Sequence, residues 1–208
     1  MGNETMGELD VLKQLLKQNL LVDISDKGGI RSVTLRERDS QAKLKTVCVG
    51  GLPEGTVVLA TDNCRPGSSL FRSSLGECRR CDYVILAQTK RKGGVAVLIE
   101  LKSWPGSGES KTPQAAESTE AECAKKCGEK FKATECILDY CDAALDRFHN
   151  QTALLKHYHK HYFVVFYKAP HLEKKPTRLE RPPNDKPDCF LKYPVVGTGG
   201  PFLEELVV

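Results

Sequence analysis

The spacing of apolar residues along the chain predicts an α/β protein. Leu9, Leu12 and Leu16 recur at helical intervals, which predicts a first helix that ends near residue 19. A longer helix is expected from about residue 119, because apolar side chains between 124 and 148 step by three and four residues over about seven turns. We expect both helices to pack an apolar stripe against a sheet.

Strand patterns fill much of the remaining chain. Short apolar runs separated by glycine-rich turns predict strands at 30–35, 45–49 and 56–60, which we interpret as a β-meander. This meander either extends the main sheet or forms a small N-terminal subdomain. The run YFVVFY at 162–167 predicts a central strand, and CFLKYPVV at 189–196 predicts a short returning strand.

The stretch around which the chain is organised is a predicted hairpin at 81–102, CDYVILAQTKRKGGVAVLIELK. Its first strand begins at Asp82, and its second strand ends in Glu100, Leu101 and Lys102. Because side chains alternate along a strand, Glu100 and Lys102 share one face, and antiparallel pairing brings Asp82 beside them. Two carboxylates and the Leu101 carbonyl form an oxygen site suited to Mg²⁺ or Mn²⁺. Lys102 can orient a water molecule or stabilise charge on a phosphate.

Asp82, the hairpin and the Glu-x-Lys sequence at 100–102 resemble the PD-(D/E)XK phosphodiesterase superfamily, which includes restriction-type endonucleases. Cys81 stands where a proline precedes the aspartate in the family pattern. The resemblance covers about half of the chain. It implies a restriction-endonuclease-like αβββαβ core, in which helices flank a mixed sheet. The N-terminal β-meander and an irregular C-terminal tail lie outside this core.

The same resemblance implies a metal-dependent nuclease that hydrolyses nucleic-acid backbones. Asp82, Glu100 and Lys102 would be catalytic, and Asp82, Glu100 and Leu101 would bind Mg²⁺ or Mn²⁺. DNA is favoured over RNA because most relatives act on DNA. The alternative is a non-catalytic nucleic-acid- or protein-binding module of the same fold within a multi-subunit complex. A homodimer or partner subunit would then contact the long helix or the apolar run at 202–208, although that run could instead dock on the core.

The length of 208 residues suits one domain with a sizeable core, and we expect a single nuclease-like domain over 1–208. Within it, 1–60 holds the first helix and the meander, and 61–168 holds the core with the active-site hairpin. Residues 169–208 form a tail rich in proline and lysine.

The formal net charge is only +4, so a nucleic-acid surface must come from local clusters of cations. Two arginines precede Asp82, three cations occupy the hairpin turn, and the resemblance implies a lysine on the helix that follows Glu-x-Lys. The same arginines and turn cations would also suit a solvated surface. The candidate nucleic-acid-binding residues are Arg79, Arg80, Lys90, Arg91, Lys92 and Lys130.

Nine cysteines are present, and their odd number without a secretory signal argues against a disulfide framework. Cys78 and Cys81 have the spacing of a metal knuckle, and Cys64 and Cys189 could complete four ligands for zinc or an iron–sulfur cluster. Some nucleases of the resembled superfamily carry such a cluster. The alternative is that the cysteines are small core residues.

The remaining composition indicates a globular protein without membrane segments. No apolar run approaches the ~20 residues of a membrane span. Residues 1–10 lack the basic and apolar regions of a signal peptide. We therefore expect a cytoplasmic protein with no membrane partner.

Overall fold

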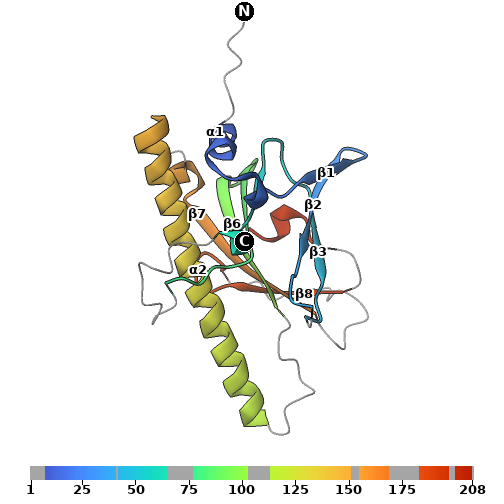
Figure 1. The fold of residues 1–208 in the computed structure, drawn as a ribbon. Coiled ribbons are helices and arrows are strands. Elements are labelled where there is room, and N and C mark those ends of the chain that lie inside the picture. The colour runs from blue at the N-terminus through green and yellow to red at the C-terminus, as the bar shows by residue number, and fades with distance from the viewer. Residues whose placement is uncertain are drawn as a thin grey trace, which may run out of the picture.

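The computed structural model describes residues 8–40, 42–64, 77–102, 113–150, 155–168, 183–196 and 200–207. These residues form helices and strands in three layers (Figure 1). The helices are α1 (Glu8–Leu15) and α2 (Pro113–His149), with short 3-10 turns η1 (Gln18–Leu20), η2 (Thr61–Asn63), η3 (Leu155–Tyr158) and η4 (Leu203–Glu205). The strands are β1 (Ile24–Lys27), β2 (Ile30–Arg36), β3 (Thr46–Gly50), β4 (Val57–Ala60), β5 (Tyr83–Thr89), β6 (Gly93–Lys102), β7 (Lys160–Lys168) and β8 (Leu191–Val195).

The central layer is a mixed sheet of five strands in the order β4-β5-β6-β7-β8. Strand β5 is antiparallel to both of its neighbours, whereas β7 is parallel to β6 and β8 is parallel to β7. Two parallel neighbours need a crossover between them, and α2 lies in the connection between β6 and β7. The expected hairpin at 81–102 and the central strand at 162–167 are therefore present.

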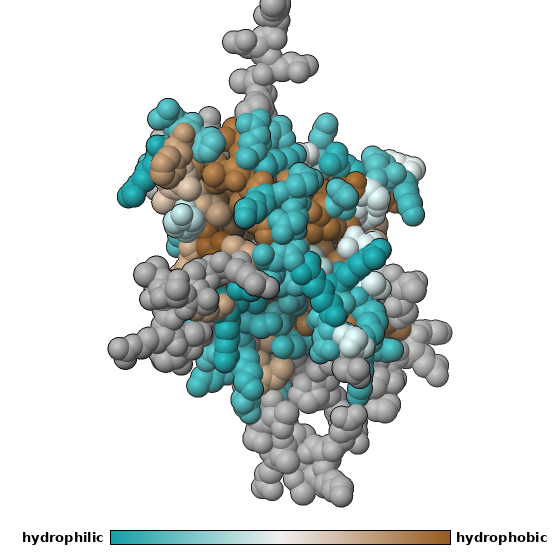
Figure 2. Space-filling model, in the orientation of Figure 1, coloured by the Kyte–Doolittle hydropathy of each residue, from teal (hydrophilic) through white to brown (hydrophobic). Residues whose placement is uncertain are grey.

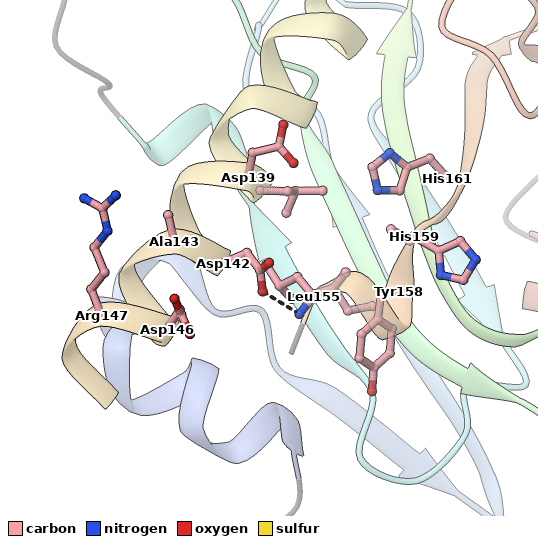
Figure 3. Close-up of a pocket in the computed structure, with 12 residues that line it drawn as sticks. Asp139, Asp142, Ala143, Asp146, Arg147, Leu155, Tyr158, His159 and His161 are labelled. Atoms are coloured by element: carbon pink, nitrogen blue, oxygen red, sulfur yellow. Dashed lines mark hydrogen bonds between the residues drawn. The ribbon is translucent and has the colours of Figure 1, made fainter. Parts of the chain in front are cut away.

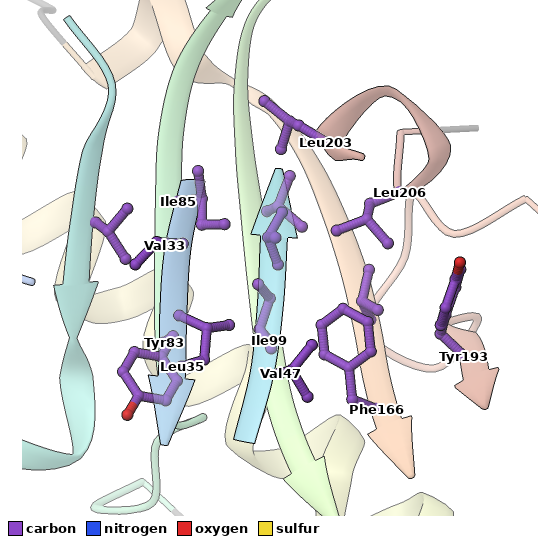
Figure 4. Packing of buried hydrophobic residues seen from close by; sticks show 14 of the residues in the cluster. Val33, Leu35, Val47, Tyr83, Ile85, Ile99, Phe166, Tyr193, Leu203 and Leu206 are labelled. Atoms are coloured by element: carbon purple, nitrogen blue, oxygen red, sulfur yellow. The ribbon is translucent and has the colours of Figure 1, made fainter. Parts of the chain in front are cut away.

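A second sheet of three strands, β1-β2-β3, is antiparallel throughout. It packs face to face on the five-stranded sheet (Figure 1). Val33, Leu35 and Val47 point from this second sheet toward Ile99 and Phe166 of the central one (Figure 4). Alternation of apolar and polar side chains along β2 and β3 gives the small sheet one buried face, which must be covered.

The structure corrects the third strand of the expected meander, the run at 56–60. It forms β4 and joins the five-stranded sheet, where Val57 pairs with Leu86 and Ala60 with Tyr83. All four residues of β4 are buried, so the strand needs cover on both faces and suits the central sheet better than the small one. The meander consists instead of β1, β2 and β3.

Both helices lie on the same face of the central sheet, which corrects the expectation of a sheet flanked by helices on its two sides. Leu12 of α1 and Phe131 of α2 belong to one buried cluster with Phe163 of β7. The Phe131 and Phe163 ring centroids are 5.2 Å apart. Apolar side chains gather on the upper half of the face shown in Figure 2, where α1 lies, beside a band of hydrophilic ones. Among the described residues, no helix is both long and apolar enough to cross a membrane.

Several residues in the described parts of the tail belong to the core. Strand β8 forms the edge of the central sheet, and Leu203 and Leu206 are buried between the two sheets. The buried Asn184 side chain donates hydrogen bonds to the Leu206 carbonyl (2.8 Å) and the Phe163 carbonyl (3.3 Å). Within the apolar run at 202–208, Leu203, Leu206 and Val207 therefore lie in the core, whereas Phe202 is 51% exposed.

Candidate active site

The structure brings Asp82, Glu100 and Lys102 together at the open end of the β5–β6 hairpin. Tyr83 pairs with Ile99, so continuing the register by one residue sets Asp82 across from Glu100. The Asp82 amide donates to the Ile99 carbonyl at 3.0 Å. The Asp82 side chain also accepts a hydrogen bond, since its Oδ2 lies 2.6 Å from the Leu101 amide nitrogen. Local hairpin pairing alone is thus enough to place the two carboxylates side by side.

Alternation along β6 decides which way Glu100 and Lys102 point. Val97 and Ile99 face the small sheet, whereas Ala96 and Leu98 face the helices. Glu100 and Lys102 continue the alternation of Ala96 and Leu98, so their side chains lie on the helix side of the sheet. The ion pairs that they make lie on that side as well. The Glu100 side chain is only 1% exposed, which is exceptional for a carboxylate.

Two lysines pair with the buried carboxylate. Lys102 Nζ lies 3.2 Å and Lys130 Nζ 2.5 Å from the same atom, Oε1 of Glu100. The other oxygen, Oε2, is buried and has no hydrogen-bond partner among the described residues. Lys130 comes from α2, as the resemblance implied for the helix after Glu-x-Lys.

Burial and, next in importance, the negative charge of Glu100 raise the pKa of Asp82 to about 7. Lys130 and the Leu101 amide oppose this shift without cancelling it. Burial lowers the pKa of Lys130, but the carboxylates of Glu100 and Asp82 outweigh burial and leave that pKa raised. A carboxyl group that titrates near neutrality beside an ionised partner is typical of active sites.

Thr134 of α2 anchors the strand end that carries Asp82. Its hydroxyl accepts a hydrogen bond from the Cys81 amide (2.9 Å) and donates one to the Lys130 carbonyl (2.8 Å). On the other side, the Thr61 hydroxyl donates to the Cys81 carbonyl at 2.6 Å. Asp82 is therefore positioned by the helix that also supplies Lys130.

The four candidate cysteine ligands lie in different settings. Cys81 is fully buried, its thiol donates to the Tyr83 carbonyl at 3.3 Å, and burial raises its pKa to about 12. Cys64 and Cys78 are partly exposed, and Cys189 is exposed. Within the described ranges, no group of three or more His, Cys, Asp or Glu residues is arranged to hold a metal ion. Cys81 belongs to the buried cluster on the helix side of the central sheet.

The two arginines before Asp82 are engaged locally. Arg79 forms an ion pair with Glu129, the residue before Lys130. Arg80 donates to the Cys78 and Asp62 carbonyls, at 3.3 Å each. Arg79 therefore lies beside the candidate site, whereas Arg80 stabilises the loop.

The cations of the hairpin turn lie far from the carboxylates. Lys90, Arg91 and Lys92 connect β5 to β6, at the opposite end from Asp82. Lys90 comes eight positions after Asp82 along an extended strand, which separates the two by about 27 Å at ~3.4 Å per residue. Lys160 adds a fourth cation there, since its Nζ donates to the Lys92 carbonyl at 2.8 Å. A nucleic acid would have to extend along the protein to contact both ends.

Sequence reasoning missed Glu37, whose negative charge adds to the raised pKa of Asp82. It follows β2 and approaches from the small sheet, 45 positions before Asp82 in the chain. Thr134 was also missed as a part of the site. No local motif marks these residues, because only the packing of separate elements brings them near.

A cavity of about 460 Å³ lies away from the carboxylates, between the C-terminal half of α2, η3 and the sheet (Figure 3). Asp142 Oδ1 accepts a hydrogen bond from the Leu155 amide at 2.9 Å on its wall. His161 lines it as well, and its Nδ1 lies 2.7 Å from Glu135 Oε1. The cavity and the candidate active site are thus separate features of one helix face.

Comparison of the chain with protein-family models, with curated proteins and with solved structures found no match.

Proposed function

We propose that the chain is a metal-dependent nuclease of the PD-(D/E)XK type that hydrolyses phosphodiester bonds, with DNA favoured over RNA. One observation carries the proposal. Glu100 is buried opposite a second carboxylate, yet its Oε2 has no partner among the described residues. A buried polar atom without a partner costs about 1–3 kcal/mol, so a structure that retains one needs an explanation.

A divalent cation fits this pair of carboxylates. Mg²⁺ commonly binds one or two carboxylates together with waters and substrate phosphates, so it does not need a full cage of protein ligands. Asp82 and Glu100 would hold the ion, and the Leu101 carbonyl stays a proposed third ligand. When bound, Mg²⁺ or Mn²⁺ would polarise a phosphate and lower the pKa of a coordinated water.

The two lysines have different tasks in this proposal. Lys130 and Lys102 both occupy Oε1 of Glu100, which leaves Oε2 available for a cation. Lys130 joins the carboxylate to α2 and positions it. Lys102 is the last residue of β6 and is partly exposed, so its ammonium group can reach a phosphate oxygen and stabilise the charge that develops there.

Chain order and strand direction support the restriction-endonuclease-like core. Helix α1, strands β4, β5 and β6, helix α2 and strand β7 follow one another in the αβββαβ order. The small sheet is inserted between α1 and β4. It covers the face of the central sheet that lies away from α2.

The alternative, a binding module within a larger complex, keeps one supporting observation. Tyr140 and Phe148 on the outer side of α2 are 75% and 79% exposed. Such side chains suit a protein partner. In the apolar run near the C-terminus, Leu203 and Leu206 are buried in the core, and Phe202 is exposed.

Cleavage of plasmid DNA, single-stranded DNA and single-stranded RNA tests the proposal, with Mg²⁺, Mn²⁺ or a chelator. We expect metal-dependent cleavage by the wild type and a loss of about 10²-fold or more in Lys102→Ala. Lys132→Ala is the matched control, since Lys132 is an exposed lysine of α2 that pairs with Asp188. Equal cleavage by the wild type and Lys102→Ala would refute this site. Binding without cleavage by folded wild type would favour the module.

A further inference from the structure

The cavity beside the C-terminal half of α2 is built into the sequence of β6. On the helix side of this strand, Leu98 is preceded by two small residues, Ala96 and Gly94. A Cβ atom at Gly94 would lie 2.1 Å from the His157 carbonyl oxygen, so the absence of a side chain lets η3 rest on the strand. Helix α2, η3 and the sheet thereby enclose a space of about 460 Å³ (Figure 3).

The floor of this cavity is apolar. It is formed by side chains from the sheet, α2 and η3 that are at most 7% exposed: Leu86, Ala96, Leu138 and Leu155. An apolar group that enters the cavity would cover this surface, which is favourable. Sites for small molecules in proteins typically have volumes of about 300–1,000 Å³ and combine such a floor with a few polar groups.

The wall that α2 contributes carries carboxylates. Asp139, Asp142 and Asp146 recur at intervals of three and four residues, so they share one side of the helix. Asp142 is engaged, because it accepts a hydrogen bond from the Leu155 amide at 2.9 Å. Asp139 and Asp146 form no ion pair or hydrogen bond within the described part of the chain. They are therefore available to a ligand.

The lining as a whole is negatively charged. Three carboxylates against the guanidinium of Arg147 give it a formal charge of −2 with histidine neutral, whereas the whole chain has +4. Arg147 lies at the rim and points away from His159 and His161 on the opposite wall (Figure 3). The Glu135 carboxylate, 2.7 Å from His161 Nδ1, adds further negative charge nearby. These charges oppose a phosphate and favour a cation.

We infer that this cavity is a binding site for a small organic cation with an apolar body. The apolar body lies on the floor, and the cationic group lies beside Asp139 and Asp146. The apolar floor favours an organic cation over a metal ion. In keeping with this, no group of three or more His, Cys, Asp or Glu side chains among the described residues is arranged to hold a metal.

Titration of the full chain with three compounds that share one apolar body tests the inference. Tryptamine, tryptophol and indole acetate carry the same indole, and their charges are positive, neutral and negative. Protein NMR follows binding, with the backbone amides of Leu155 and His161 as reporters of the cavity. We expect tryptamine to bind about tenfold more tightly than tryptophol, and indole acetate more weakly than either. Equal affinities for tryptamine and tryptophol, no saturable binding, or shifts confined to residues outside the cavity would overturn the inference.

A double variant tests the charged wall. Asp139→Asn combined with Asp146→Asn should lower the affinity for tryptamine to that for tryptophol, and leave the affinity for tryptophol unchanged. The matched control is Glu120→Gln combined with Asp188→Asn, which removes the same charge from solvent-accessible carboxylates in ion pairs outside the cavity. The control should bind tryptamine like the wild type. An undiminished preference for tryptamine in the first variant would refute the role of the two aspartates.

A third variant tests the floor. Ala96→Leu puts a larger side chain into the cavity, and we expect it to abolish binding of tryptamine and tryptophol alike. Retained affinity in the folded variant would place the compounds elsewhere. If Ala96→Leu does not fold, the aspartate variant still decides. Since none of these readouts uses cleavage or a metal ion, failure of the nuclease proposal would leave them unaffected.

Discussion

Lys130 Nζ on α2 lies 2.5 Å from Oε1 of Glu100 on β6, and this contact ties the long helix to the central strand. Lys102 shares the same oxygen at 3.2 Å. The buried carboxylate thus depends on two cations, one from its own strand and one from a different layer of the fold.

Replacing Lys130 by Met should lower the free energy of unfolding by about 1–3 kcal/mol, because Glu100 would stay buried with only one cation. Urea denaturation measures the change. Lys132→Met provides the control. It removes an exposed ion pair with Asp188, and we expect it to change stability by about 0.5 kcal/mol or less. Equal losses in the two variants would mean that Lys130 adds nothing beyond a surface contact.

Asp82→Asn should make the metal-free protein more stable at pH 8. The folded pKa of Asp82, about 7, exceeds its ordinary value of 3.8, so the folded state binds more protons between these pH values. The Asp82 contribution to the unfolding free energy therefore falls as pH rises from about 4 to about 7. Asn removes this loss, on the order of 4 kcal/mol, and its side-chain oxygen still accepts a hydrogen bond from the Leu101 amide. Urea midpoints at pH 5 and pH 8 in chelator measure it. A gain at pH 5 as large as that at pH 8 would argue against a raised pKa.

Mg²⁺ or Mn²⁺ should raise the melting temperature of the wild type. A ligand that binds only the folded state at 100 times its dissociation constant adds about 2.7 kcal/mol. Glu100→Gln should abolish the shift, because it removes the negative charge from the unpartnered oxygen. Asp188→Asn, which changes an exposed carboxylate that pairs with Lys132, should keep it. A shift of equal size in Glu100→Gln would place the ion elsewhere.

Gln in place of Lys90, Arg91 and Lys92 should weaken DNA binding and its salt dependence without changing the rate of cleavage at saturation. Each lost phosphate contact reduces the slope of log K against log salt by about 0.9. The turn lies at the far end of β5 from Asp82, so the reacting groups are left intact. Fluorescence anisotropy at several salt concentrations measures the slope. An unaltered slope would show that the turn is a solvated surface.

The sequence pattern predicted the residues of the site that belong to a single hairpin. Asp82, Glu100 and Lys102 lie on one hairpin, whose register and alternation follow from the sequence. The run at 56–60 was grouped with the strands of the meander, and the sequence left open which sheet it joins. Its apolar residues suit any buried strand, and only the distant partner β5 decides. Glu37 and Thr134 come near the site through packing between layers, for which a single sequence carries no signal.

The contacts of the site also differ in sequence separation. The two carboxylates belong to one hairpin, whereas one of their cations comes from a later helix. Asp82 and Glu100 become neighbours when a short loop closes, a step of low entropic cost. Lys130 arrives only when α2 docks, and β7 pairs with β6 across a connection of more than fifty residues. During folding, the two negative charges therefore meet while still hydrated, before either layer covers them. We expect the transition state for folding to carry this repulsion, so that refolding should accelerate at acidic pH or with divalent cations.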